Sequence, residues 1–130
     1  MKILQTIIVK QILTEASRQK LLDRYKGEKH QLEKECIQLQ FVQKKMEKAG
    51  SFPYGQIKKH FEKEQLARKE RIGVLEFQIS QLHMLPLGSE LKESEVQAIV
   101  EIKPGDSWDG GLHQEEIIIR DGVIEEIRKR

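Results

Sequence analysis

Two long segments of similar length carry stripes of mostly apolar residues at alternating spacings of three and four, and one short breaker separates them. The first stripe consists of Leu22, Tyr25, Lys29, Leu32, Cys36, Leu39, Gln43 and Met46, and the second of Phe61, Gln65, Arg68, Ile72, Leu75, Ile79 and Leu82. This spacing places each stripe along one side of an α-helix, so the two helices are expected to pack as an antiparallel coiled-coil hairpin. Such a hairpin is a solvated arm without a deep pocket.

Start and stop signals set the expected bounds of the two helices. Thr14 is a good N-cap, and Gly50 supplies the left-handed exit from the first helix. Pro53 is tolerated in the first turn of the second helix. We therefore expect the arm to span residues 15–85, with helices over 15–49 and 54–84 and a turn over 50–53.

The segments on either side of the arm have the patterns of strands. Residues 1–14 are rich in β-branched side chains, and in residues 95–102 apolar side chains alternate with mostly polar ones. Asp121-Gly122 lies between two further apolar runs and is the strongest hairpin signal in the chain. We expect an α+β fold in which residues 1–14 and a three-stranded meander within 86–130 form a small antiparallel sheet, curled toward a barrel.

Composition agrees with an exposed arm and excludes some classes of protein. Charged residues make up 34% of the 130 residues and aromatic residues 5%. No run approaches the roughly 20 apolar residues of a membrane span. The single cysteine, Cys36, forms no internal disulfide and occupies a stripe position, where packing is a more common role than redox chemistry. We expect a cytoplasmic protein that does not enter the membrane.

The connection between the two helices is basic. Residues 44–63 contain six lysines against Glu47 and Glu62. Lysines hold phosphates, and aromatic rings stack on bases. The candidate contact residues for RNA or for a protein partner are Lys44, Lys45, Lys48, Phe52, Tyr54, Lys58 and Lys59, with Phe61 nearby. The alternative interpretation is a solvated helix end whose aromatic residues hold the turn together.

Residues for catalysis are scarce. The four histidines are scattered, and the chain has no glycine-rich phosphate loop, nucleophile elbow or cysteine pair for zinc. Only the loop of residues 104–113 brings Asp106, Trp108, Asp109 and His113 close in sequence. This loop is interpreted as a strand connection with Trp108 folded over the sheet edge, and the alternative is a hydrolase or metal site. We expect no catalytic residues, no cofactor, no metal and no enzymatic activity.

One stretch carries a family resemblance. Residues 82–91, Leu-His-Met-Leu-Pro-Leu-Gly-Ser-Glu-Leu, taken with residues 9–14 and the hairpin at 121–124, resemble the YlqD family of Bacillus and related bacteria. The resemblance spans the whole chain and carries over no activity, substrate or catalytic residues. It implies a link to translation, because the genes of this family tend to lie among genes for ribosomal proteins, ribosome maturation and tRNA methylation.

These patterns lead to two functional hypotheses. The first is a non-enzymatic, homo-oligomeric interaction or scaffold protein that presents the coiled-coil arm to an unknown protein partner. Self-association is expected because the stripe is partly polar and because sheet edges need cover. The second hypothesis is an RNA- or ribosome-binding accessory factor that uses the basic end of the arm.

Overall fold

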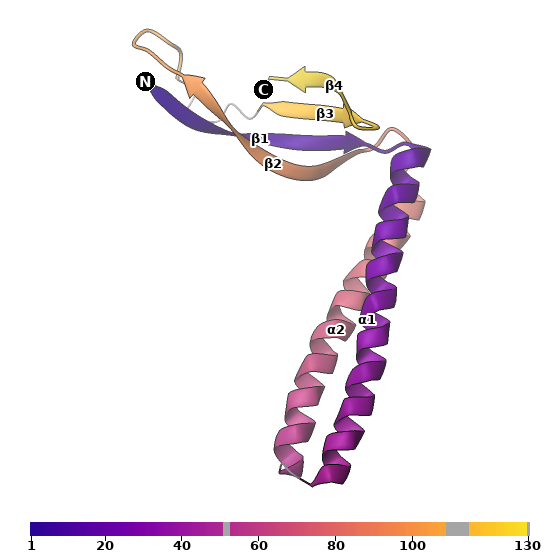
Figure 1. Ribbon diagram of the computed structural model, residues 1–130. Coiled ribbons are helices and arrows are strands. Elements are labelled where there is room, and N and C mark those ends of the chain that lie inside the picture. Colours follow the sequence, from indigo (N-terminus) through magenta and orange to yellow (C-terminus); the bar gives the residue numbers. More distant parts are fainter. Residues whose placement is uncertain (51–52, 109–114, 130) are drawn as a thin grey trace. The chain divides into compact units, whose positions relative to one another are not determined.

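The chain has an α+β fold of two helices and a four-stranded mixed sheet, and its computed structural model describes residues 1–50, 53–108 and 115–129. The elements follow in the order β1 (Lys2–Ile12), α1 (Glu15–Ala49), α2 (Tyr54–Met84), β2 (Glu90–Glu101), β3 (Glu116–Arg120) and β4 (Val123–Arg128) (Figure 1). They form two compact units. The sheet unit comprises Met1–Arg18 and Leu85–Arg130, and the helical unit comprises Gln19–Met84.

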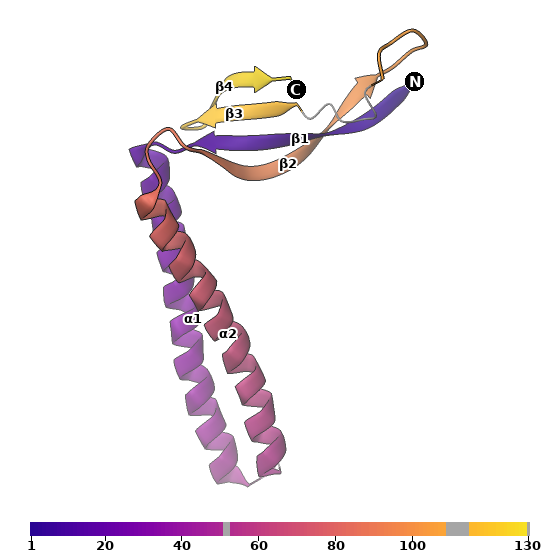
Figure 2. The same cartoon turned by 180° about the vertical axis from the view of Figure 1, so that it is seen from behind.

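The strands of the sheet unit lie in the order β2-β1-β3-β4 (Figures 1 and 2). β1 pairs antiparallel with β2 along its whole length and parallel with β3 from Ile8 to Gln11. β3 and β4 form an antiparallel hairpin. Its turn residues Asp121 and Gly122 both have positive φ, 47° and 80°, as a two-residue hairpin turn of the I′ kind requires. The hairpin predicted at Asp121-Gly122 is thus confirmed.

The predicted antiparallel sheet with a C-terminal meander is wrong, because β1 lies between β2 and β3 and pairs parallel with β3. A meander needs sequential strands joined by tight turns, and the β2–β3 connection is long enough to cross β1 instead. β2 also begins at Glu90 rather than near Glu95. Its pairing with β1 shifts register between Val9 and Lys10, whose partners are Ser94 and Lys92, so Glu93 is the extra residue of a β-bulge.

The start of α1 is fixed within the sheet unit by a reciprocal cap. The Ser17 backbone N–H donates to Thr14 Oγ1 at 3.1 Å, and the Thr14 N–H donates to Ser17 Oγ at 2.8 Å. The Thr14 hydroxyl also donates to Asp121 Oδ1 at 2.6 Å, which ties the cap to the β3–β4 turn. Leu13, which precedes Thr14, and Ile118, in the strand that leads to Asp121, are fully buried. Thr14 is therefore the N-cap, as predicted.

The helical unit consists of α1 from Gln19 onward and α2, which run antiparallel side by side (Figures 1 and 2). Two hydrogen bonds between the helices fix this direction: Arg71 of α2 bonds to Glu28 of α1, and Gln65, earlier in α2, bonds to the Cys36 carbonyl, later in α1. All residues of the two predicted stripes are buried or half-buried. Gly50, with φ of 63°, follows α1, and Pro53 precedes α2. Residues 51 and 52 of the predicted turn lie outside the described residues.

Candidate functional site

The middle of the helix pair is held by polar contacts in addition to apolar packing. The Arg71 guanidinium donates to both carboxylate oxygens of Glu28, at 2.9 and 3.2 Å. The Gln65 amide donates to the Cys36 carbonyl at 2.8 Å. Lys29 lies 3.5 Å from the Glu76 carboxylate. These contacts join α1 to α2 and fix which residues face each other along the pair.

Hydrogen bonds from arginine lower the pKa of two carboxyl groups in the helix pair. The hydrogen bond from Arg71 lowers the pKa of the Glu28 carboxyl below its ordinary value. The hydrogen bond from Arg68 likewise lowers the pKa of the Glu64 carboxyl, which lies 2.8 Å from Arg68 Nη1. The charged forms of these carboxylates are therefore favoured in the folded helices. Their role is structural, since each is engaged by a guanidinium.

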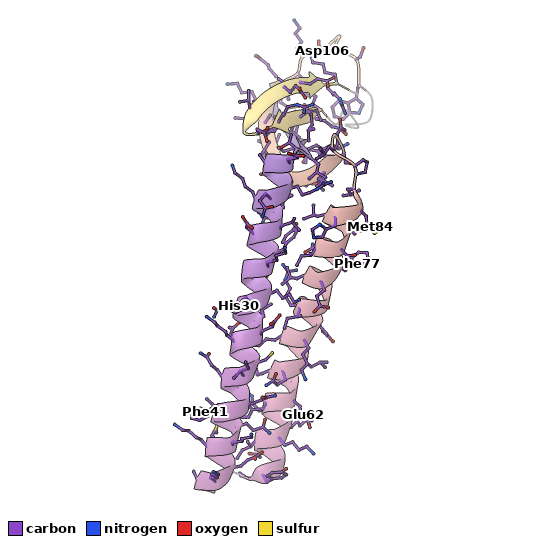
Figure 3. The ribbon with its side chains drawn as sticks, turned by 90° about the vertical axis from the view of Figure 1, so that its right-hand side faces the viewer. His30, Phe41, Glu62, Phe77, Met84 and Asp106 are labelled. Atoms are coloured by element: carbon purple, nitrogen blue, oxygen red, sulfur yellow. The ribbon has the colours of Figure 1, made fainter. Side chains whose placement is uncertain are left out.

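Both helices also present large apolar side chains on the sides that face away from each other. On α1, Ile37 and Phe41 are exposed at i, i+4 spacing, and Lys45 Nζ lies 4.7 Å from the centre of the Phe41 ring. On α2, the exposed set is Leu66, Val74, Phe77 and Met84. Figure 3 shows Phe41 on the outer side of α1 and Phe77 and Met84 on the outer side of α2. We call these two sets the α1 edge and the α2 edge.

The basic end of the helical unit, which we call the tip, comprises the last two turns of α1 and the first two turns of α2. The structure brings together and exposes the predicted contact residues Lys44, Lys45, Lys48, Tyr54, Lys58 and Lys59, whereas Phe52 lies outside the described residues. Lys58 pairs weakly with Glu62 at 4.0 Å. Within the described part of the tip, no carboxylate lies at ion-pair distance from Lys44, Lys48 or Lys59.

The tip differs from the sequence-based interpretation in the aromatic residues available for stacking. Phe61 is only 4% exposed, and Ile57 one turn earlier is equally buried. The Phe61 ring meets His60 edge-on at 5.2 Å between centroids. Phe61 therefore belongs to the packing between the helices, and Tyr54 is the exposed aromatic residue among those described at the tip.

The strand register separates the sheet into two chemically different faces. Residues that pair directly across strands share a face, so Ile7, Val96, Val9, Ile117 and Ile127 lie together. The same register gives the full aliphatic face: Ile3, Ile7, Val9, Leu91, Val96, Ala98, Val100, Ile117, Ile119, Ile124 and Ile127. Gln5, Gln11 and Ser94 are the polar residues of this face within the paired strands, and no paired residue on it is charged.

The opposite face of the sheet, the charged face, carries a set of ion pairs. Lys10 Nζ lies 3.1 Å from the Glu116 carboxylate, which is 2% exposed. Arg128 donates to Glu90 at 2.8 Å and lies 3.2 Å from Glu126. The hydrogen bond from Arg128 lowers the pKa of the Glu90 carboxyl. Because Glu90 is in β2 and Arg128 is in β4, this pair links the two outer strands. Alternation in the sequence places Ile3, Ile7 and Val9 on one side of the first strand, and Val96, Ala98 and Val100 on one side of the strand at 95–102. Which of these sides lie together in the sheet depends on register, which the sequence did not predict.

The residues considered for catalysis or metal binding do not form a site in the described part of the chain. Asp106 Oδ2 accepts a hydrogen bond from the Lys103 N–H at 3.0 Å, as in a turn. Trp108 is largely exposed rather than folded against the sheet edge, and Asp109 and His113 lie outside the described residues. Among the residues described, no three His, Cys, Asp or Glu side chains gather as metal ligands. Neither described helix combines the length and apolarity needed to cross a membrane.

Comparisons with known proteins match the whole chain. The family model described as "YlqD protein" matches residues 1–128. The "Uncharacterized protein YlqD" of Bacillus subtilis (strain 168) is 46% identical over 132 residues, which covers 100% of each protein. A crystal structure of a protein of unknown function from Synechococcus sp. WH 8102 is similar with a TM-score of 0.88 at 19% identity, over 98% of this chain and 96% of that chain. At that identity the structural match shows the fold alone.

Proposed function

We propose that this chain, which belongs to the YlqD family, is a non-enzymatic, self-associating interaction protein of the cytoplasm that presents a coiled-coil arm to a protein partner. The observation that carries the proposal is the pair of apolar edges on the helical unit. Phe41 on the α1 edge is 59% exposed and Phe77 on the α2 edge is 63% exposed. Each lies one helical turn from a second exposed apolar residue, Ile37 for Phe41 and Val74 for Phe77, and exposed apolar residues that adjoin one another are typical of protein contact surfaces.

The burial pattern of the helices supports the coiled-coil part of the proposal. Every position of the 3,4-spaced stripes is buried or half-buried, and Leu22, Phe61, Leu75 and Leu82 within them are buried. Each helix therefore uses one side for its partner helix and leaves the edges for other contacts. An amphipathic helix edge with apolar residues at i, i+3 and i+4 spacings docks into an apolar groove of another protein.

A capture experiment with matched variants tests the proposal. The tagged full chain is used to capture proteins from the cells that produce it, and the same is done with Phe77→Lys and with Gln81→Lys. Gln81 is an exposed residue of the same helix whose replacement removes no large apolar side chain. We expect wild type and Gln81→Lys to retain the same proteins and Phe77→Lys to lose them. Capture of nothing by wild type, or of the same set by Phe77→Lys, contradicts the proposal.

The second candidate function is RNA or ribosome binding through the tip. The observation that favours it is the exposure of Lys44, Lys48 and Lys59, which have no carboxylate at ion-pair distance within the described residues. Each lysine–phosphate contact makes binding weaker as salt rises. The genomic setting implied by the family resemblance, among genes for ribosome maturation, points in the same direction.

Fluorescence anisotropy with structured and single-stranded RNA at two salt concentrations tests this second function. Neutralising Lys44 and Lys48 with glutamine should weaken binding similarly for all sequences and flatten the salt dependence by about one unit of slope for each phosphate that is no longer bound. Tyr54→Ala should cost about 1–3 kcal/mol with single strands if a base stacks there. Lys26→Gln, an exposed lysine elsewhere on α1, is the control. Absence of binding by wild type at low salt contradicts this function.

A further inference from the structure

We propose that the aliphatic face of the sheet packs against the same face of a second copy of this chain. The inference deepens the proposed function and rests on its self-association, for which it names the surface. It starts from the asymmetry of the sheet, in which the ion pairs between described residues of the paired strands gather on one face or at the hairpin end. The other face is aliphatic apart from Gln5, Gln11 and Ser94.

The aliphatic face is partly exposed in every strand of the sheet. Val96 in β2 and Ile124 and Ile127 in β4 are exposed, and Ile3 in β1 and Ile117 and Ile119 in β3 are half-buried. A sheet with one apolar face is stable when that face is packed against another layer, as in a sandwich of two sheets about 10 Å apart. A second sheet of the same kind provides such a layer.

The exposed area matches a small, specific interface. A valine or isoleucine side chain holds roughly 60–120 Å² of apolar surface, so the partly exposed residues of this face offer on the order of 300 Å² per copy. The smallest specific interfaces bury about 1,000 Å² in total, or about 500 Å² per partner, of which about 57% is non-polar. The non-polar share that each copy must supply is therefore also about 300 Å². An affinity in the micromolar range is expected.

Charge explains why a second copy is the occupant we infer. In a two-fold symmetric contact each surface meets itself, so a charged surface is matched only where opposite charges are placed to meet across the axis. The charged face also exposes Leu4, Ile99 and Val123. Its Lys10–Glu116 and Arg128–Glu90 ion pairs, however, are already formed within the sheet and would have to be desolvated in such a contact. The aliphatic face brings no charges together when it meets its own copy. It also offers few hydrogen-bonding groups to select a polar partner.

Two substitutions in β4 test which face of the sheet forms the dimer. Ile127 lies on the aliphatic face and is 60% exposed, whereas Val123 lies on the charged face and is 68% exposed. We expect sedimentation equilibrium of the full chain from about 1 to 100 µM to show a dimer for wild type and for Val123→Lys. Ile127→Lys should dimerise at least tenfold more weakly. Val96→Lys in β2 is a second variant on the aliphatic face, and circular dichroism confirms that each variant is folded.

The outcomes distinguish failure of this inference from failure of the proposed function. If wild type is dimeric and folded Ile127→Lys and Val96→Lys are equally dimeric, the aliphatic face is not the interface, and self-association through the arm survives. If Val123→Lys dissociates as readily as Ile127→Lys, the dimer forms by pairing of the β4 edges, and the proposed packing of the aliphatic faces is overturned. A monomer at every concentration overturns both the inference and the self-association on which it rests.

Discussion

Replacing one buried leucine of α2 and one exposed leucine of the same helix measures what holds the helical unit together. Leu75 is 0% exposed and belongs to the stripe that faces α1, whereas Leu66 is 58% exposed and belongs to the α2 edge. Leu75→Ala and Leu66→Ala make the same chemical change in the same helix. Any effect on intrinsic helix propensity is therefore nearly equal in the two variants.

The expected magnitudes follow from burial. Leucine to alanine removes about three carbons, worth roughly 2.5 kcal/mol when the side chain is fully buried, at about 0.8 kcal/mol each. A cavity would add to this cost, but two helices can close on a gap more easily than a globular core can. We therefore expect Leu75→Ala to lower the free energy of unfolding by about 2.5 kcal/mol. Leu66→Ala, with under half of its side chain covered, should cost less than about 1 kcal/mol.

Urea unfolding followed by circular dichroism at the helix wavelength is the assay, because α1 and α2 supply the helical content of the described chain. With a denaturant slope of about 1–3 kcal/mol per molar urea, the midpoint for Leu75→Ala should fall by roughly 0.8–2.5 M. Equal midpoints for the two variants would refute the reasoning. That result would mean that the stripe contributes no more to stability than the edge does.

Three further predictions concern acid and glycine. The contribution of Glu28 and Glu64 to the stability of the helical unit should be complete from neutral pH down to the ordinary glutamate pKa of 4.5 and decline below it, because their pKa values are lowered in the folded state. Stability that rises on acidification below this pH, measured by urea unfolding, would contradict the sign. Gly27→Ala should stabilise α1 by up to about 1 kcal/mol, since nothing lies within 4 Å of the added Cβ, and a lower midpoint in urea would count against this. Gly122→Ala should lower the thermal midpoint by the equivalent of about 1–2 kcal/mol because its φ is 80°, and an unchanged midpoint would show that the turn relaxes.

The helices were predictable because their signals are local. The 3,4 spacing depends only on helical geometry, and the cap at Thr14 and the left-handed exit at Gly50 act within one turn of the helix. The hairpin at Asp121-Gly122 is local for the same reason, since two residues with positive φ determine it. Each of these features needs no knowledge of distant residues.

The sheet order and its faces were not predictable in this way. β1 has apolar residues on both of its sides, such as Ile7 on one and Ile8 on the other, so its alternation does not choose a face. The choice follows from register, which aligns Ile7 with Val96 and Val9 with Ile117. These pairs join residues far apart in sequence, and no local turn in the sequence predicts the parallel pairing of β1 with β3. Local propensity therefore left the strand order open.

The tip shows how packing limits the chemistry that a sequence suggests. By proximity in sequence, Phe61 belongs with the lysines, but by spacing it belongs to the stripe, and the structure places it there at 4% exposure with Ile57 beside it. Two buried apolar residues close to the turn hold the ends of the helices together, so the exposed lysines are displayed on ordered helical turns. Stacking at the tip then falls to Tyr54 among the described residues. A nucleic acid bound there would be held mainly through its phosphates, and this is why salt dependence, more than preference for single strands, separates RNA binding from a protein contact at the same surface.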